Sequence, residues 1–220
     1  MRSLLVINPN TSESITALLE KHVRAVTADA LQLHVVTARF GGPYIADEAS
    51  YAVAQHATLD AWKAVRERGV EPGAVLVGCF GDPGLFALRE VAGVPVSGLA
   101  EAAFAAAARH GRFAIVTGGE RWKPMLERLA LGLGFGDALA GVHTVAPNGV
   151  QLSQDPVGAR SLLATACRDA AQRFGAQAVI LGGAGLAGMG AQIAPQLSVP
   201  LIDSVEAAAQ WALGAATDTR

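Results

Sequence analysis

The sequence predicts an α/β fold with parallel sheets, and two observations lead to this prediction. Short apolar runs of β-strand type alternate with longer segments of helical periodicity along the 220 residues, which is typical of strands joined by crossover helices. The two halves of the chain also carry similar segments in the same order. We therefore expect two similar lobes, related by a pseudo-twofold axis, with a cleft between them.

Each strand is predicted from a short apolar run and each helix from a longer periodic segment. The strands are expected at residues 4–8, 33–38, 74–78, 95–98, 113–118, 142–146, 178–182 and 200–204. The helices are expected at residues 12–26, 47–69, 82–91, 99–111, 121–134, 155–175 and 205–214. Asp155 before Pro156 is typical of a helix start, and Gly69, Gly111 and Gly175 are typical of helix ends.

The internal repeat is clearest after each valine-proline pair. VPVSGLAEAAFAAA from Val94 aligns with VPLIDSVEAAAQWA from Val199 and places Glu101 opposite Glu206. The same alignment sets the turn that contains Cys79 opposite the turn that contains Gly183. We infer two Rossmann-like lobes, residues 1–105 and 106–220, and we allow for helices exchanged across this boundary.

The composition of the chain indicates which kinds of molecule it can bind. The chain is 51% hydrophobic and 16% charged, with a formal net charge of −2 and scattered basic residues. Such a chain can bury a large core and offers no basic surface to nucleic acid or an anionic membrane. We expect neither a membrane-spanning segment nor a signal peptide, because no uninterrupted apolar run of eighteen residues occurs and the first residues lack a long apolar segment and a cleavage site. We therefore expect a cytoplasmic protein that acts on a small molecule, and we expect it to form a homo-oligomer.

Four turns lie where chemistry is expected, beyond the carboxyl ends of parallel strands. They are residues 8–12, 78–84, 117–120 and 182–185, and they are rich in small and polar side chains. A Gly-Pro-rich loop before residue 47 is long enough to cover a cleft. The candidate substrate-binding residues are Asn8, Asn10, Thr11, Ser12, Tyr44, Ile45, Phe80, Gly81, Thr117, Gly118, Gly119, Gly183 and Ala184.

Cys79 has two interpretations. Asp82 and Pro83 are typical of the cap and first residue of a helix, which would place the thiol near a positive helix end and lower its pKa. Cys79 could equally be a small buried hydrophobe at the end of a strand. Cys167 lies inside a helical segment and is expected to pack in the core. Neither cysteine has the spacing of a metal site or a disulfide, so we expect two thiols and no metal.

His56 is the histidine that best fits an acid or base. It follows the loop that contains Tyr44, and Asp60 lies one helical turn later, where it could orient the imidazole. The alternative is an ordinary pair on the surface of a helix.

Six motifs taken together resemble the aspartate/glutamate/hydantoin racemase superfamily, and most closely its hydantoin and allantoin racemase branch. They are INPNTS, GCFGDPGL, PVSGLAEAA, VTGGERW, VILGGAGLAG and PLIDSVEAA, in this order from the first strand to the last helix. The resemblance implies two α/β lobes, no cofactor, and racemisation by two cysteines on opposite faces of the substrate carbon. Cys79 matches the first of these cysteines.

The second cysteine of that family normally stands in a GCAG turn, and here the turn is GGAG with Gly183 in its place. Three hypotheses follow. The first is a racemase that uses Cys79 together with His56 or a held water. The second is a decarboxylase of the arylmalonate type, in which Cys79 protonates one face. The third is a binding protein without catalysis. The neutral turn at residues 8–12 favours a hydantoin-like ring over a free amino acid, and Ala184 stands where glutamate racemases carry a histidine.

Overall fold

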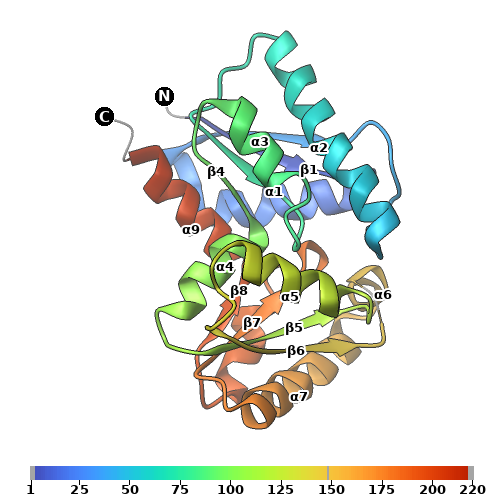
Figure 1. The fold of residues 1–220 in the computed structure, drawn as a ribbon, viewed down its shortest axis with the longest axis vertical. Helices are drawn as coiled ribbons and strands as arrows, with labels where there is room; N and C mark the ends of the chain where they lie inside the picture. The colour runs from blue at the N-terminus through green and yellow to red at the C-terminus, as the bar shows by residue number, and fades with distance from the viewer. Residues whose placement is uncertain (1–2, 148, 218–220) are drawn as a thin grey trace.

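The computed structural model describes residues 3–147 and 149–217, and its strands form two parallel sheets. The first sheet has the order β2-β1-β3-β4 and the second has the order β6-β5-β7-β8. Their strands are β1 (Ser3–Asn8), β2 (Gln32–Thr37), β3 (Ala74–Val77), β4 (Val96–Gly98), β5 (Phe113–Gly118), β6 (Leu139–Val145), β7 (Ala178–Gly182) and β8 (Leu201–Asp203). The identical order in the two sheets confirms the α/β fold with two similar lobes, which lie end to end in Figure 1.

Helices cover both sheets, as the crossover connections of parallel strands require. The predicted helices are α1 (Glu13–Thr27), α2 (Glu48–Glu67), α3 (Leu85–Ala92), α4 (Leu99–Ala108), α5 (Trp122–Gly132), α7 (Pro156–Phe174) and α9 (Ser204–Thr217). The short helices α6 (Gly149–Gln154) and α8 (Gly190–Ile193) were not predicted, because segments of this length show no apolar periodicity. In the described part of the chain, no helix is long and apolar enough to cross a membrane.

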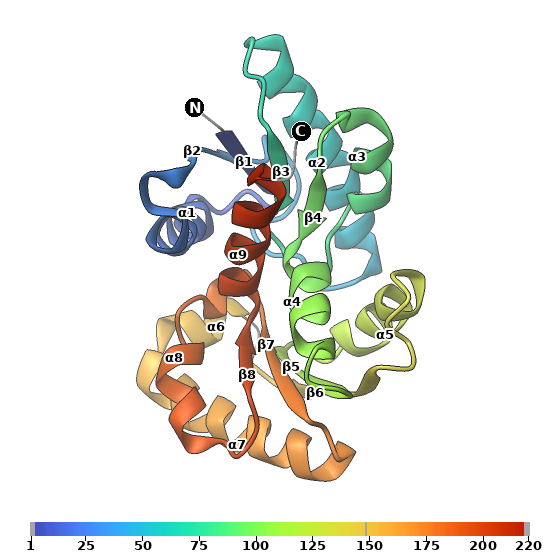
Figure 2. The same cartoon turned by 90° about the vertical axis from the view of Figure 1, so that its left-hand side faces the viewer.

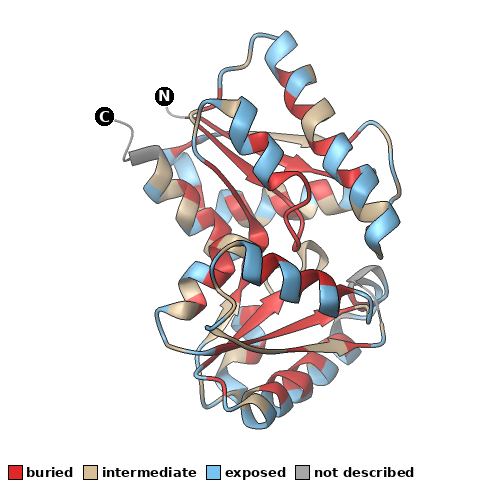
Figure 3. Cartoon of the chain, in the orientation of Figure 1, coloured by how far each residue is buried: buried red, intermediate tan, exposed pale blue. Residues whose placement is uncertain are grey.

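The sheets lie in the interior, as their composition demands. Every residue of β1, β3, β5 and β7 is buried, which is expected for central parallel strands covered on both faces. The exposed residues lie mainly on the outer faces of the helices (Figure 3). Cys167 is fully buried in α7 against the second sheet, which confirms that it is a core residue.

The last helix of each sequence half packs on the other half's sheet. Helix α4 follows β4 of the first sheet but contacts β7 of the second, and α9 follows β8 of the second sheet but contacts α1 and β3. The two helices lie side by side where the lobes meet (Figure 2). The boundary proposed between residues 105 and 106 falls inside α4, and it stays a prediction about how the chain divides.

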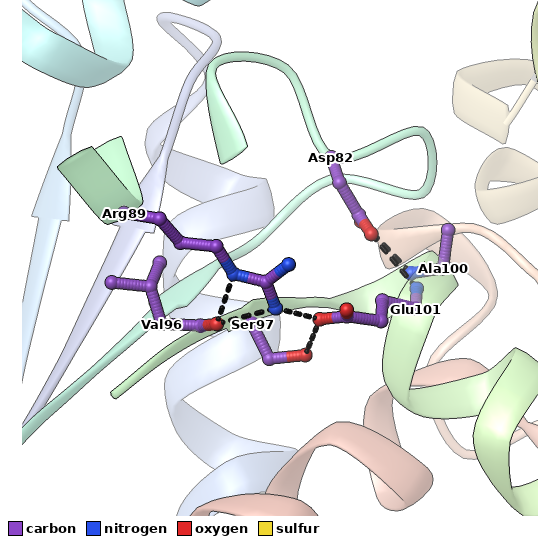
Figure 4. A network of polar contacts seen from close by, with 6 residues as sticks. All are labelled: Asp82, Arg89, Val96, Ser97, Ala100 and Glu101. Carbon is purple, nitrogen blue, oxygen red and sulfur yellow. Dashed lines mark hydrogen bonds and ion pairs between the residues drawn. The ribbon is translucent and has the colours of Figure 1, made fainter. Parts of the chain in front are cut away.

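A buried carboxylate fixes the start of α4. Both oxygens of Asp82 accept hydrogen bonds from the first turn of that helix, from the backbone N–H of Ala100 at 2.9 Å and of Glu101 at 2.8 Å (Figure 4). A Cβ on Gly98 would collide with the Asp82 carboxylate, so the cap depends on the absent side chain at residue 98. Burial raises the pKa of Asp82 to about 7, while its hydrogen bonds to the backbone favour the ionised form.

This contact corrects the predicted role of Asp82 as the cap of its own following helix. That helix, α3, begins only at Leu85, and Gly84 in a left-handed conformation precedes it. The pseudo-symmetry of the two lobes explains why Asp82 caps α4 and not α3. Asp203 accepts hydrogen bonds from the N–H groups of Val205 and Glu206, so it caps α9 from the position that aligns with Gly98. Asp82 therefore supplies from another loop the carboxylate that the first repeat lacks.

Replacing Asp82 with asparagine should destabilise the protein. At pH 8, above the pKa of Asp82, the substitution turns one acceptor into a donor that faces a backbone N–H. We expect the free energy of unfolding to fall by about 1–3 kcal/mol, measured by urea denaturation followed by circular dichroism.

Asp155→Asn is the matched control for this substitution. Asp155 is an exposed cap whose carboxylate accepts from the N–H of Gly158 at 3.0 Å, and asparagine caps a helix about as well as aspartate. Its unfolding curve should be almost unchanged. Equal small effects at both positions would show that Asp82 holds no buried cap.

Candidate active site

A pocket lies where the carboxyl ends of the two sheets face each other. It contains about 550 Å³ of space that atoms do not fill, open solvent at its mouth included. The lining residues come from both lobes and are mostly small or apolar: Asn10, Ile15, Tyr44, Ile45, Gly78, Cys79, Phe80, Thr117, Gly118, Trp122, Gly182, Gly183, Ala184, Gly185 and Leu186. A mostly apolar lining with a few polar groups is typical of a small-molecule site.

The first lobe contributes Cys79 and Phe80, which follow β3 directly. Cys79 is 8% exposed and lines the pocket. The ring of Phe80 lies against Gly182 at the end of β7, so closely that a Cβ on that glycine would overlap it. The loop that carries the thiol is therefore seated directly on the second lobe. The hydroxyl of Tyr51, on α2, supports the same loop by donating to the carbonyl of Gly81 at 2.8 Å.

The turn at residues 8–12 is stabilised by its own hydrogen bonds, and one of its side chains lines the pocket. The buried Asn8 amide donates to Oδ1 of Asn10 and to Oγ1 of Thr16, both at 3.0 Å. Ser12 accepts from Ile15 and caps α1, and the N–H of Thr11 donates to the carbonyl of Gly42. Asn8, Thr11 and Ser12 thus build the turn. Only Asn10 among these four lines the pocket.

The second lobe contributes the end of β5. Thr117, which is 5% exposed, and Gly118 line the pocket beside Trp122 at the start of α5. Tyr44 reaches them from the loop between β2 and α2, and its hydroxyl donates to the carbonyl of Gly118 at 3.5 Å. Gly81 and Gly119 were predicted as substrate contacts, but both lie outside the lining and pack against Trp122.

The wall that completes the pocket is the turn after β7. Gly183 has φ +147° and ψ 130°, a backbone conformation that side-chain-bearing residues rarely adopt. A Cβ built there would lie 3.3 Å from Cγ of Leu186. The N–H of Gly183 donates to Oγ of Ser204 at 3.2 Å. The backbone conformation at residue 183 therefore suits glycine, and the turn carries no thiol.

The pKa of Cys79 is raised, which corrects the predicted lowering. Burial is the main cause, and the nearby Asp82 carboxylate adds to it. The expected positive helix end is distant, because α3 starts six residues after Cys79 and not at Asp82. In the free pocket the group is therefore a neutral thiol. The thiolate that forms from it is a stronger base than an ordinary one, since basicity follows pKa.

His56 is not brought to the pocket. It is exposed on α2, where its ring lies 5.1 Å from the ring of Phe40. Its expected partner Asp60 instead accepts a hydrogen bond from Nε of Arg39 at 2.9 Å. An imidazole outside the lining cannot exchange a proton with a molecule held beside Cys79, so the geometry removes the basis for naming His56 as the second base.

Sequence reasoning missed several lining residues, and most of them adjoin a motif that it had named. Gly78, Gly182 and Gly185 stand beside predicted residues in the same turns, and Ile15 lies in the first turn of the helix after residue 12. Trp122 follows the turn at 117–120, but nothing in its spacing indicated that it faces the cleft. In the described part of the chain, no three His, Cys, Asp or Glu side chains gather as metal ligands.

Comparison with known proteins agrees with this geometry. A family model described as Asp/Glu/hydantoin racemase matches residues 4–212. The hydantoin racemase of Paenarthrobacter aurescens is 34% identical over 95% of this chain and 89% of its own length. The allantoin racemase of Klebsiella pneumoniae superposes with a TM-score of 0.89 at 35% identity, over 97% of this chain and 87% of that one. Arylmalonate decarboxylase shares the fold, with a TM-score of 0.67 at 16% identity over 99% of this chain and 94% of that one.

The native thiols should resist alkylation. Burial raises the pKa of both cysteines, to about 12 for Cys167, and the thiolate is the reactive form. At pH 8 we expect iodoacetamide to modify the folded protein about tenfold or more slowly than free cysteine, and to modify both residues after unfolding. Intact-mass spectrometry measures this. One rapid equivalent that disappears in Cys79→Ser would instead mean a lowered pKa at Cys79.

Gly183→Ala should cost stability because of the backbone alone. The positive φ of Gly183 disfavours any side chain, and we expect a loss of about 1–3 kcal/mol in the free energy of unfolding. Gly214→Ala is the matched control, because Gly214 is an exposed helical glycine with open space at its Cβ position. There the same change should stabilise by about 0.5–1 kcal/mol. Two shifts of the same sign would contradict the assigned conformation of the turn.

Proposed function

Because the chain belongs to the Asp/Glu/hydantoin racemase family, we propose that it is a cofactor-independent racemase that moves a proton at the carbon beside a carbonyl of a hydantoin-like ring. The observation that carries this proposal is the position of Cys79, the one thiol among the described lining residues, at the meeting point of two lobes. The hydantoin and allantoin racemases among its relatives support the substrate class.

Cys79 is the proposed acid and base on one face of the substrate. As a thiolate it takes the proton from the ring carbon and becomes a thiol, and as a thiol it gives a proton back. Its raised pKa suits this role, because a weakly acidic carbon requires a strong base.

The other polar lining groups fit the carbonyls of a cyclic amide. Among the described residues, none accepts a hydrogen bond from Nδ2 of Asn10, whose Oδ1 is held by Asn8 and by the N–H of Ser12. This donor can therefore point to a ring carbonyl. The hydroxyl of Thr117 lies on the opposite lobe. With no acidic or basic side chain in the described lining apart from Cys79 and Tyr44, a neutral ring fits better than a free amino acid.

A one-sided decarboxylase is the second candidate, and the Gly183 turn favours it. A single thiol facing a wall of glycine and alanine suits an enzyme that only needs to protonate one face of an enediolate. Arylmalonate decarboxylase shares the fold. A protein that binds such rings without catalysis remains the third outcome of the experiment below. The homo-oligomeric state and the cytoplasmic location stay predictions.

One enantiomer of a 5-substituted hydantoin in D₂O, with the wild-type protein, tests the proposal. Proton NMR follows the loss of the signal of the hydrogen on the ring carbon, and polarimetry follows the rotation. A racemase exchanges the hydrogen and loses the rotation, and Cys79→Ser should lower the racemisation rate by about 10²–10⁴-fold.

The other results point elsewhere. If wild-type protein exchanges the hydrogen without losing rotation, Cys79 works on one face only and malonate substrates come next. If no exchange occurs above the rate without protein, and Cys79→Ser binds the ring as well as wild type does, the protein is a binder and the racemase proposal is wrong.

A further inference from the structure

The proposed racemase needs a second acid or base, because the proton must leave one face of the ring carbon and return to the other. Gly183 cannot supply it and His56 lies outside the pocket. Among the described lining residues only Cys79 and Tyr44 have side chains that titrate. Tyrosine is one of the side chains that perform general acid-base catalysis in enzymes.

Tyr44 stands on the correct side of the pocket for this task. Its loop belongs to the first lobe, but its hydroxyl reaches the carbonyl of Gly118 at the end of β5. Strand β5 pairs with β7, where Thr117 lies opposite Gly182, so Gly118 is next to the turn that carries Gly183. Cys79 lies at the end of β3 in the other sheet. The thiol therefore lies beside the first sheet, whereas the phenol hydroxyl lies at the end of the second.

The surroundings leave room for a phenol on that side. The end of β7 and the turn after it present Gly182, Gly183, Ala184 and Gly185 to the pocket. This wall offers backbone and a single methyl group where a longer side chain would occupy space. The N–H of Thr11 donates to the carbonyl of Gly42 at 3.1 Å, which ties the loop that carries Tyr44 to the turn at residues 8–12. The half-buried phenol is thus held in place at its hydroxyl end and through its loop.

We propose that Tyr44 is the second acid and base, in place of the thiol missing at residue 183. This inference rests on the proposed racemase function. For one enantiomer, the Cys79 thiol first gives up its proton to solvent. The resulting thiolate takes the ring hydrogen as a proton, the C–H electron pair passes into the enolate, and the Tyr44 hydroxyl protonates the opposite face. The products are the inverted ring, a Cys79 thiol and a Tyr44 phenolate. The other enantiomer runs through the same steps in reverse, and no oxidant or cofactor takes part.

Tyr44→Phe tests the assignment with both enantiomers in D₂O. The variant keeps Cys79, which can still remove the hydrogen from one enantiomer and return a deuteron to the same face. We expect racemisation to fall by about 10²-fold or more, one enantiomer to exchange with its rotation retained, and the other to show no exchange. Cys79→Ser should give the opposite pattern. A residue that only shaped the pocket would slow both enantiomers alike.

Tyr51→Phe is the matched control. It removes one tyrosine hydroxyl, the one bonded to Gly81, from a side chain outside the pocket lining. Whatever its effect on rate, both enantiomers should be affected equally and exchange should stay coupled to loss of rotation.

The two proposals fail in different ways. Wild-type protein that racemises no hydantoin overturns the racemase, whatever the variants do. Wild-type protein that racemises, together with a Tyr44→Phe variant that still racemises both enantiomers at a similar rate, keeps the racemase and overturns the role of Tyr44, leaving a bound water as the second base. Circular dichroism of each variant establishes that a loss of rate is not a loss of fold.

Discussion

The buried carboxylate of Asp82 is the interaction on which the arrangement of this molecule depends. It lies three residues after Cys79 and caps α4, the helix that leaves the first sheet and packs on the second. One side chain therefore fixes the loop that carries the thiol and the helix that joins the lobes. Two hydrogen bonds to backbone N–H groups at a helix start offset part of the cost of burying a charge there. On the outer side of the same turn, Glu101 is held by Ser97 at 2.7 Å and by the guanidinium of Arg89 (Figure 4).

The same carboxylate influences the chemistry next to it. A thiolate at Cys79 forms near a group that carries negative charge when ionised, in a buried site, and both conditions raise its pKa. Burial thus makes the thiol harder to ionise and makes its thiolate a stronger base. A lowered pKa would suit a nucleophile, which must be ionised at rest. A raised pKa suits proton transfer with carbon, in which the group must also be able to hold the proton that it removes.

Sequence reasoning predicted the strands, the long helices and the repeat, because these depend on local periodicity and on patterns present twice in the chain. The rule for parallel strands grouped the turns that carry Asn10, Cys79, Thr117 and Gly183, and the structure brings these four to one pocket. Tyr44 reaches the same pocket from the loop between β2 and α2. Sequence reasoning misassigned Asp82 because Asp-Pro is a strong local signal for a helix cap. In the structure the Asp82 carboxylate instead accepts a hydrogen bond from Ala100, 18 residues away, in a helix whose position in space the local pattern cannot indicate. The wrong prediction of a lowered pKa for Cys79 had the same cause, because it relied on a helix that starts at Asp82. His56 failed for a related reason, since an i, i+4 spacing does not indicate which side of a helix faces a cleft or that Arg39 would engage Asp60.

A thiol and a phenol on opposite faces make an asymmetric pair, and thermodynamics limits where the asymmetry can be observed. Two enantiomers have the same free energy in an achiral solvent, so the ratio of kcat/KM in the two directions must equal one, whatever groups perform the transfer. Since kcat/KM compares the transition state with free enzyme and free substrate, unequal bases leave it equal for both enantiomers. They can change kcat and KM separately, because the bound states of the two enantiomers meet the pair in different protonation states. Equal kcat/KM values therefore do not identify the two groups that transfer the proton. Only a measurement that separates the faces, as isotope exchange with retained configuration does, can distinguish a phenol at Tyr44 from a water.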